Sequence, residues 1–294
     1  MDNDKINCRV CGSDERRYLC STHNSQSATA EIRHYRCLNC GSVFVGNDIS
    51  NEELGVAYGS LDEPTYYDAI ESTNVIKLQS IAETFKSKFP ATARIIDIGC
   101  GDGTFIRILK EAGFTDVWGQ EIPGHGEAAR EYANGVYEDY DQSTIPPQHF
   151  DVVTMIDVME HVPSPLDTLR RTNAVLRPGG TLYFHSPRVS MLDRAMHALG
   201  GQVLPIWQNS RTSVFHLQNY SDQGINKMLK TAGFSPTLIE ARNELTWPMA
   251  LYVKVYLMKP LRLPEFTIPP ISAALRPILK GPMNRNKAVV MAVK

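Results

Sequence analysis

The stretch Arg94-Ile-Ile-Asp-Ile-Gly-Cys-Gly-Asp-Gly-Thr104 decides the fold of this chain. Ala93 to Ile98 is a short run rich in β-branched residues, as expected of a strand buried in a parallel sheet. This run leads into three glycines, which permit a tight turn: Gly99, Gly101 and Gly103. Phe105 to Ala112 follows with helical spacing. A strand, a glycine turn and a helix in this order predict the first unit of an α/β domain.

The same alternation continues along the chain. Further strands are predicted at Asp116 to Gln120, Val136 to Tyr137, Asp151 to Ile156 and Thr181 to His185. Helices are predicted at Glu127 to Ala133, Pro165 to Leu176 and Asp222 to Ala232. Alternating strands and helices predict a doubly wound parallel sheet. Two later strands, Thr237 to Leu245 and Ala288 to Val293, must then join a sheet that is already built.

Length and composition indicate a globular protein. The 294 residues are enough for about two domains, and 43% hydrophobic with 21% charged residues is an ordinary globular composition. A formal net charge of −2 disfavours a nucleic acid partner. The polar N-terminus does not resemble a secretory signal, and no apolar run is long enough to span a membrane. We therefore expect a cytoplasmic protein without a membrane span.

Two cysteine pairs near the N-terminus have the spacing of a metal site. Cys8-x-x-Cys11 and Cys37-x-x-Cys40 are each followed by a glycine that relieves the turn. Four thiolates complete a closed tetrahedral shell, which suits a structural zinc ion rather than a catalytic one. The alternative is four unrelated buried cysteines. We predict a zinc ribbon over residues 1–47, in which Cys20, His23 and His34 are not ligands.

The glycine loop predicts a ligand that carries positive charge. Its spacing, Gly-x-Gly-x-Gly, departs from the G-x-G-x-x-G fingerprint of dinucleotide-binding loops. Asp97 and Asp102 would repel a pyrophosphate but would attract an amino group. Glu121, directly after the second strand, is placed to accept both hydroxyls of a ribose. After the third strand, Asp139 is the first choice for an adenine contact, with Glu138 or a backbone amide as alternatives.

Five segments together resemble the successive motifs of class I methyltransferases, which use S-adenosyl-L-methionine: Asp97-Ile-Gly-Cys-Gly-Asp-Gly103, Glu121, Phe150-Asp-Val-Val153, Asp157-Val-Met-Glu-His161 and Leu176-Arg-Pro-Gly-Gly180. The resemblance covers residues 91–245. It implies a Rossmann-like sheet of strand order 3-2-1-4-5-7-6 whose last strand is antiparallel. It also implies that Asp97, Gly99 and Gly101 line the methionine part and that Glu121 binds the ribose.

The remaining cofactor residues and the domain limits follow from this resemblance. Cys100, Asp102 and Asp157 are expected at the same cofactor site, and Tyr67, in a helical segment over residues 48–90, is expected to cover it or simply to pack the helix. The methyltransferase domain is predicted over residues 91–294, with an irregular insertion at 187–220 and an apolar cap at 247–284. A ribbon followed by such a domain also resembles bacterial methyltransferases that act on sugars, glycans or secondary metabolites.

Three histidines are candidates for the reacting centre. A hydroxyl acceptor needs a general base, and the pKa of histidine suits that role. His161 follows the fourth strand at the sheet edge that carries the glycine loop, His216 lies in the insertion, and His185 ends the fifth strand. The alternative for His161 is that it caps the following turn, and for His216 that it is a buried structural residue. A divalent ion on Glu160 and His161 lacks an evident third ligand, and we do not predict it.

The acceptor is the least defined part of the prediction. The cap can pack on the sheet, cover an acceptor pocket, form a dimer contact or rest on a lipid surface through Lys254, Lys259 and Arg262. We expect methyl transfer to a small-molecule, glycan or lipid-linked acceptor, at a hydroxyl oxygen. The alternatives are an RNA methyltransferase whose ribbon binds RNA, and an inactive ribbon-bearing binding protein.

Overall fold

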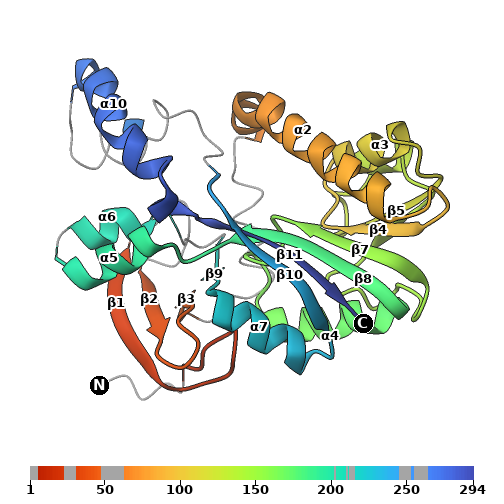
Figure 1. Cartoon of the computed structure of the whole chain (residues 1–294), viewed down its shortest axis with the longest axis horizontal. Helices are drawn as coiled ribbons and strands as arrows, with labels where there is room; N and C mark the ends of the chain where they lie inside the picture. The colour runs from red at the N-terminus through yellow and green to blue at the C-terminus, as the bar shows by residue number, and fades with distance from the viewer. Residues whose placement is uncertain are drawn as a thin grey trace.

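The computed structural model describes residues 6–22, 31–47, 63–201, 203–209, 211, 216–244, 253–254 and 264–294, and only the backbone for 63–73, 203, 206 and 209. These residues form two sheets (Figure 1). The larger sheet has seven strands, which run in the order β10-β11-β8-β7-β4-β5-β6. Their bounds are β4 Arg94–Ile98, β5 Asp116–Glu121, β6 Val136–Glu138, β7 Phe150–Ile156, β8 Leu176–Pro187, β10 Ser235–Arg242 and β11 Lys287–Val293.

This order is the predicted 3-2-1-4-5-7-6, and the Rossmann-like fold is therefore confirmed. β4 pairs in parallel with β5 and β7, whereas β11 is antiparallel to both β8 and β10. The last strand can enter between β8 and β10 because its apolar residues are buried on both faces, as an internal strand requires. The predicted late return of the chain into the sheet is confirmed as well.

Helices cover both faces of this sheet (Figure 1). α2 (Glu63–Lys88) and α3 (Thr104–Glu111) lie on one face, and α4 (Pro165–Val175) and α7 (Asp222–Thr231) lie on the other. Successive strand residues point to opposite faces, so Ile95 packs with Phe85 of α2 while Ile96 packs with Leu169 of α4. Continuous apolar strands thus supply two cores, one on each side of the sheet.

Some local elements differ from the prediction. Residues expected to form a helix at Glu127 to Ala133 form only a short 3-10 turn, Ala128–Glu131, in which Ala129 alone is buried. So little apolar surface does not support a longer helix. The insertion at 187–220 is not irregular, because it contains α5 (Met191–Leu199) and α6 (Val203–Asn209). A capping box between Ser190 and Asp193 starts α5.

The N-terminal sheet joins the ribbon to the rest of the chain. β1 (Arg16–Thr22), β2 (Ile32–Cys37) and β3 (Val43–Val45) form an antiparallel ribbon, and β9 (Gln218–Asn219) pairs with β3 as its fourth strand. The Val45 amide also donates to the Leu217 carbonyl at 2.8 Å. The ribbon therefore shares a sheet with the segment that follows the α5–α6 insertion.

The C-terminal part of the predicted cap contains α10 (Ile268–Leu279), which projects from one end of the molecule (Figure 1). Residues 245–252 and 255–263, which hold most of the apolar cap residues, lie outside the described part of the chain. Phe266, before α10, has 79% of its surface exposed. None of the described helices has both the length and the apolar character needed to cross a membrane.

Candidate functional site

The glycine loop lies between β4 and α3 and has the backbone that its glycines allow. Gly99, Gly101 and Gly103 have φ values of 70°, 53° and 83°, in the left-handed region that other residues avoid. At Gly103 a Cβ would lie 2.7 Å from the Cα of Ala129, so a larger residue would displace the neighbouring turn. The loop therefore keeps a tight, exposed curve at the carboxyl end of β4.

Asp97 and Glu121 both lie beside this loop. Asp97 is buried, and its Oδ1 accepts a hydrogen bond of 2.5 Å from the Thr154 hydroxyl. Burial raises the pKa of Asp97 to about 7; the Thr154 hydrogen bond opposes that rise and the charge of Glu121 adds to it. Glu121 Oε2 accepts from the Gly101 amide at 2.8 Å. Two carboxylates and the glycine loop thus gather where a cationic ligand was predicted.

The other two loop residues have structural contacts. The Cys100 side chain is buried against Gly119, where a Cβ would lie 2.7 Å from its sulfur. Asp102 accepts from the Thr104 amide at 2.9 Å and from the Thr104 hydroxyl at 2.8 Å, at the start of α3. Cys100 can therefore reach a ligand only through its backbone, and Asp102 holds the first turn of the helix.

Asp139 follows β6 as predicted, but its carboxylate holds its own loop. Oδ2 accepts from the Thr144 amide at 2.9 Å and from its hydroxyl at 2.5 Å, and Oδ1 accepts from the Gln142 amide at 2.7 Å. Glu138, the alternative adenine contact, forms an ion pair of 2.8 Å with Arg130. The Asp139 carboxylate is buried within its own loop, whereas the Glu138 carboxylate is partly exposed. Tyr67 belongs to α2, and its side chain lies outside the described part of the chain.

Asp157 lies in a cluster of partly buried charges that the sequence did not reveal. Its carboxylate contacts Lys77 of α2 at 2.8 Å, Lys287 of β11 at 2.5 Å and His185 of β8 at 3.3 Å. Glu244 completes the cluster, 3.1 Å from His185 Nε2. Burial alone would raise the pKa of Asp157, but Lys287 and Lys77 outweigh it and hold the pKa well below its usual range. Asp157 is therefore a fixed anion between two cations.

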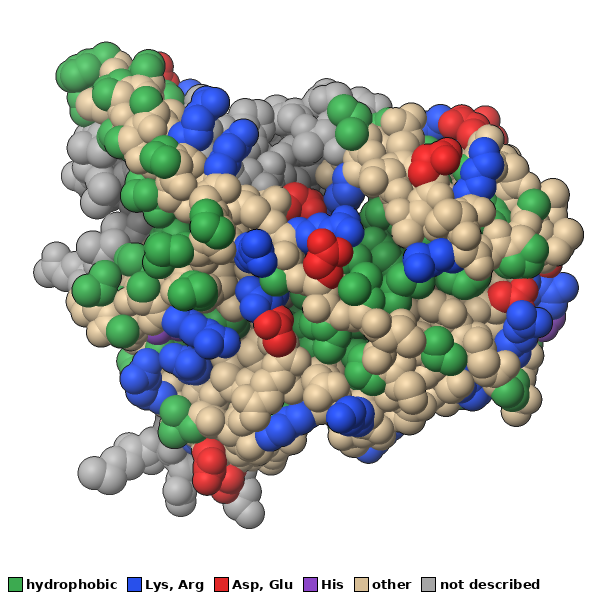
Figure 2. All heavy atoms as spheres, in the orientation of Figure 1, with side chains coloured by type: hydrophobic (Ala, Val, Ile, Leu, Met, Phe, Trp, Pro, Cys, Tyr) green, Lys and Arg blue, Asp and Glu red, His purple; other side chains and the backbone are tan. Residues whose placement is uncertain are grey.

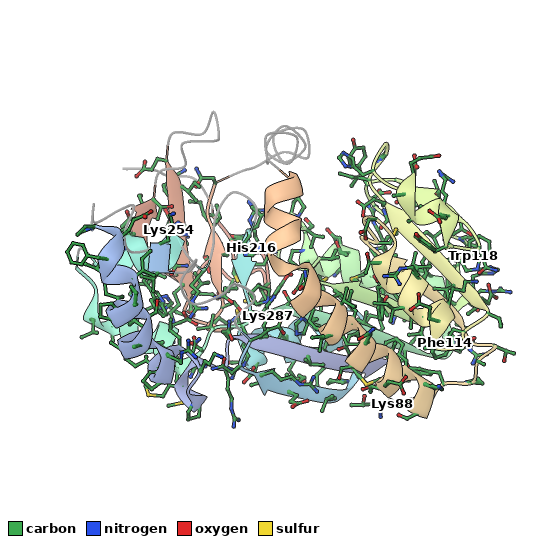
Figure 3. All side chains as sticks on the ribbon, turned by 90° about the horizontal axis from the view of Figure 1, so that it is seen from above. Lys88, Phe114, Trp118, His216, Lys254 and Lys287 are labelled. Atoms are coloured by element: carbon green, nitrogen blue, oxygen red, sulfur yellow. The ribbon has the colours of Figure 1, made fainter. Side chains whose placement is uncertain are left out.

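His161 and His216 meet although they come from distant segments. Their ring centroids are 4.8 Å apart at an angle of 73°. The Leu217 amide donates to the Glu160 carbonyl at 2.7 Å, and the Gln218 side chain donates to the carbonyls of Met159 and Val162. These bonds fasten the start of β9 to the loop after β7. Figure 3 shows His216 and Lys287 near the centre of the molecule.

Glu160 joins this histidine pair. The carboxylate is buried; Oε2 accepts from the Ser186 hydroxyl at 2.8 Å, and no donor among the described residues bonds to Oε1. One ligand atom from each of Glu160, His161 and His216 lies within 4.8 Å of the other two. The structure thus supplies the third ligand that the sequence lacked. A carboxylate with two imidazoles can act on an acceptor proton or hold a divalent ion.

His185, the third candidate, faces the charge cluster instead. It is 2% exposed, and contacts with Asp157 and Glu244 raise its pKa against the effect of burial. The same contact with His185, together with Lys77 and Lys287, lowers the pKa of Glu244 to about 2, although burial alone would raise it. His185 therefore belongs to the ion-pair cluster and not to the histidine pair.

The four predicted cysteines form one cluster. The sulfur of Cys8 lies 3.7 Å from that of Cys40, and the sulfur of Cys11 lies 3.6 Å from that of Cys37. All four ligand atoms lie within 4.8 Å of one another. In each knuckle the glycine after the second cysteine has a positive φ, 73° at Gly12 and 78° at Gly41, and donates its amide to the first cysteine. The geometry agrees with the predicted ribbon and suits a tetrahedral metal.

Comparison with known families and sequences points to methyl transfer. A family model described as a methyltransferase domain matches residues 72–239. A ubiquinone biosynthesis O-methyltransferase of Actinobacillus pleuropneumoniae is 32% identical over 131 residues, which make up 40% of this chain and 55% of that protein. The corresponding protein of Ruegeria pomeroyi is 31% identical over 153 residues, 50% of this chain and 61% of that protein. The chain thus spans little more than half the length of these curated relatives.

Solved structures share the fold at lower identity. The magnesium protoporphyrin IX methyltransferase of Synechocystis PCC 6803 is 14% identical with a TM-score of 0.50, covering 81% of this chain and 90% of that chain. The [4+2]-cyclase SpnF is 18% identical with a TM-score of 0.50, covering 74% and 80%. Identities this low establish the fold alone, and one of these two structures is named for a different reaction.

Proposed function

The chain belongs to the methyltransferase domain family, and on that premise we propose that it moves a methyl group from S-adenosyl-L-methionine to a hydroxyl oxygen of a small-molecule or glycan acceptor. The observation that carries the proposal is the pairing of the glycine loop with Glu121, whose carboxylate accepts from the Gly101 amide. The O-methyltransferase relatives support an oxygen acceptor.

The cofactor site fits the charge of S-adenosyl-L-methionine. Among the described residues, no cation lies within ion-pair distance of Asp97, so an amino group of the ligand would offset a buried carboxylate. We assign the methionine part to Asp97, Gly99 and Gly101, and the ribose to Glu121. Bound there, the cofactor supplies a methyl carbon on a positively charged sulfur, which leaves as a neutral thioether.

The protein then has to align the acceptor and accept its proton. Because the displacement is in-line, most of the rate comes from holding the oxygen behind the methyl carbon and excluding water. We assign the general base to His161, with His216 packed against it and Glu160 buried beside both. As the acceptor oxygen takes up the methyl group, the hydroxyl proton would pass to an imidazole nitrogen of His161. The fixed cluster around Asp157 borders this centre through Lys287, 3.9 Å from Glu160.

The three side chains also have the donor set of a divalent-metal site. A catalytic ion there would take over the task of lowering the pKa of the acceptor hydroxyl. Dialysis against a chelator tests this metal-dependent mechanism. The mechanism would be favoured if activity were lost on dialysis and restored by Mg²⁺ or Mn²⁺ while zinc stayed on the cysteines. At the ribbon, we propose that Cys8, Cys11, Cys37 and Cys40 hold a structural zinc ion.

Labelled cofactor tests the proposed reaction. The purified chain is incubated with methyl-labelled S-adenosyl-L-methionine and cell extract, and label is then measured in nucleic acid, protein, lipid and small-molecule fractions. We expect label in the small-molecule or glycan fraction, and roughly 100-fold less of it with His161→Gln at unchanged cofactor affinity. Label found chiefly in RNA would mean that the acceptor is RNA and not a small molecule or glycan. Cofactor binding without turnover in any fraction would favour a binding protein.

A further inference from the structure

A polar cavity lies at the junction of the ribbon with α5 and α7. Its volume is about 350 Å³, within the size range of small-ligand sites. The cavity is lined by Arg17 of β1, Arg36 of β2, Arg194 of α5, Ser221 and Gln223, and by residues within 37–41 of the second knuckle, which include two of the proposed zinc ligands, Cys37 and Cys40. Figure 2 shows Lys and Arg side chains gathered where α5 meets β1 and β2. None of these residues belongs to the proposed methyl-transfer site.

The three arginines have no internal counter-charge. Within the described part of the chain, no carboxylate lies within 4.0 Å of the guanidinium group of Arg17, Arg36 or Arg194. The acids next to Arg194 and Ser221 in the sequence are already paired, since Asp193 contacts Arg211 at 3.0 Å and Asp222 contacts Arg188 at 2.5 Å. Three cations of like charge therefore face one cavity uncompensated.

The start of α7 adds to the positive field. Ser221 is the N-cap of this ten-residue helix, and its hydroxyl accepts from the Gly224 amide at 2.9 Å. A helix N-terminus carries a partial positive charge and favours anions. Ser221 lies on the cavity wall, so the helix dipole and the arginines act on the same space. An anion bound there would satisfy both.

We propose that this cavity binds a phosphate-bearing small ligand, with the three guanidinium groups holding the phosphate oxygens. Guanidinium groups match phosphate geometry because two N–H groups can donate in parallel to two oxygens. The site takes phosphate chemistry, whether it comes as a phosphomonoester, a diphosphate or a nucleotide. The cavity wall itself joins the ribbon to α7, since the Ser221 hydroxyl donates to the Cys40 carbonyl.

Titration calorimetry with the full chain tests this site. The probes are inorganic phosphate, inorganic pyrophosphate and adenosine diphosphate at low salt, and the variants are Arg17→Gln, Arg36→Gln and Arg194→Gln. We expect saturable binding of one phosphate-bearing probe per chain, weakened roughly tenfold by each substitution. The probe that binds most tightly identifies the source of the phosphate.

Arg16→Gln is the matched control. Arg16 precedes Arg17 on β1 and therefore points to the other face, where it lies over the Tyr35 ring. The Arg16→Gln substitution removes the same charge from the same strand and should leave the affinity for the phosphate probe unchanged. Equal losses with Arg16→Gln would mean a diffuse charge effect and would overturn the proposal. The proposal would also be overturned if none of the three probes bound saturably. It would be overturned as well if only single-stranded RNA bound and the same three substitutions weakened that binding.

Discussion

Replacing Glu121 by glutamine keeps the shape of the side chain and removes its charge. In the structure, Oε2 accepts from the Gly101 amide and Oε1 accepts from the Ile122 amide, both at 2.8 Å. The carboxylate is thereby fixed at the end of β5, at the position assigned to the ribose hydroxyls. A glutamine offers only one oxygen, so its amide NH₂ must face one of these two backbone N–H groups and cannot accept from a ribose hydroxyl on that side.

The expected loss follows from that mismatch. A hydrogen bond to a charged group contributes about 1.5–3 kcal/mol, and 1.4 kcal/mol corresponds to tenfold in affinity. Loss of one such bond to the ribose should therefore weaken binding of S-adenosyl-L-methionine roughly 10- to 150-fold. S-adenosylhomocysteine has the same ribose, so its affinity should fall by the same factor.

Calorimetry with both ligands measures the effect, and thermal unfolding reports whether the variant is folded. Glu127→Gln is the matched control, because that carboxylate is 89% exposed and pairs with Arg130 on the surface. We expect no change in affinity for the control. Folded Glu121→Gln that binds both ligands within twofold of the unaltered chain would refute the assignment of Glu121 to the ribose.

Three further predictions concern the ribbon, the loop and pH. Cys40→Ser should abolish the binding of one zinc ion per chain and lower the midpoint temperature of unfolding. Cys20→Ala should retain the metal, because Cys20 is buried in β1 outside the cluster. Measurement of the metal content checks this, and zinc retained by Cys40→Ser would contradict it. In denaturant unfolding, Gly99→Ala should destabilise the chain more than Gly101→Ala. Both glycines have a positive φ, but only at Gly99 would a Cβ lie against Val158, 2.6 Å away. Equal losses of stability would contradict this explanation. The pKa of Asp97, raised to about 7, predicts that cofactor affinity falls by about tenfold per pH unit below 7, where the carboxyl gains a proton. Thr154→Val removes the hydrogen bond that lowers this pKa and should shift the fall to higher pH, and identical profiles from pH 6 to 9 would exclude Asp97 as the contact.

The sheet could be predicted because its information is local. The central strands β4, β7 and β11 are short, mostly apolar runs, and such a run predicts its own burial without its neighbours. Ile95 and Ile96 then separate onto opposite cores by strand alternation alone. The strand order came from the resemblance in motifs and not from spacing. The cysteine cluster could be predicted because two knuckles of fixed spacing already bring each pair of sulfurs together.

The charge cluster could not be predicted, because its members are far apart in sequence. Lys77, Asp157, Glu244 and Lys287 come from four segments, and no local pattern relates them. Burial is the only reason that they must pair, since an isolated buried charge is costly. A lysine at the start of an apolar strand, as at Lys287, is the one available signal. The positive φ of Asp157, 57°, is visible only in the structure.

Local patterns and contacts between distant segments differ in what a sequence reveals, and this difference explains why the cofactor could be predicted and the acceptor could not. The proposed cofactor residues lie within one continuous stretch, from Asp97 to Glu121, which a single strand-loop-helix-strand unit brings together. The proposed reacting centre instead joins both ends of the chain: Arg9 of the ribbon donates to the Pro163 carbonyl, β3 pairs with β9, and β11 carries Lys287. β9, which follows His216, is held both by the loop after β7 and by β3 of the ribbon. The cysteine cluster is therefore connected to the proposed reacting centre through backbone pairing, and the proposed alignment of the acceptor depends on contacts between distant segments.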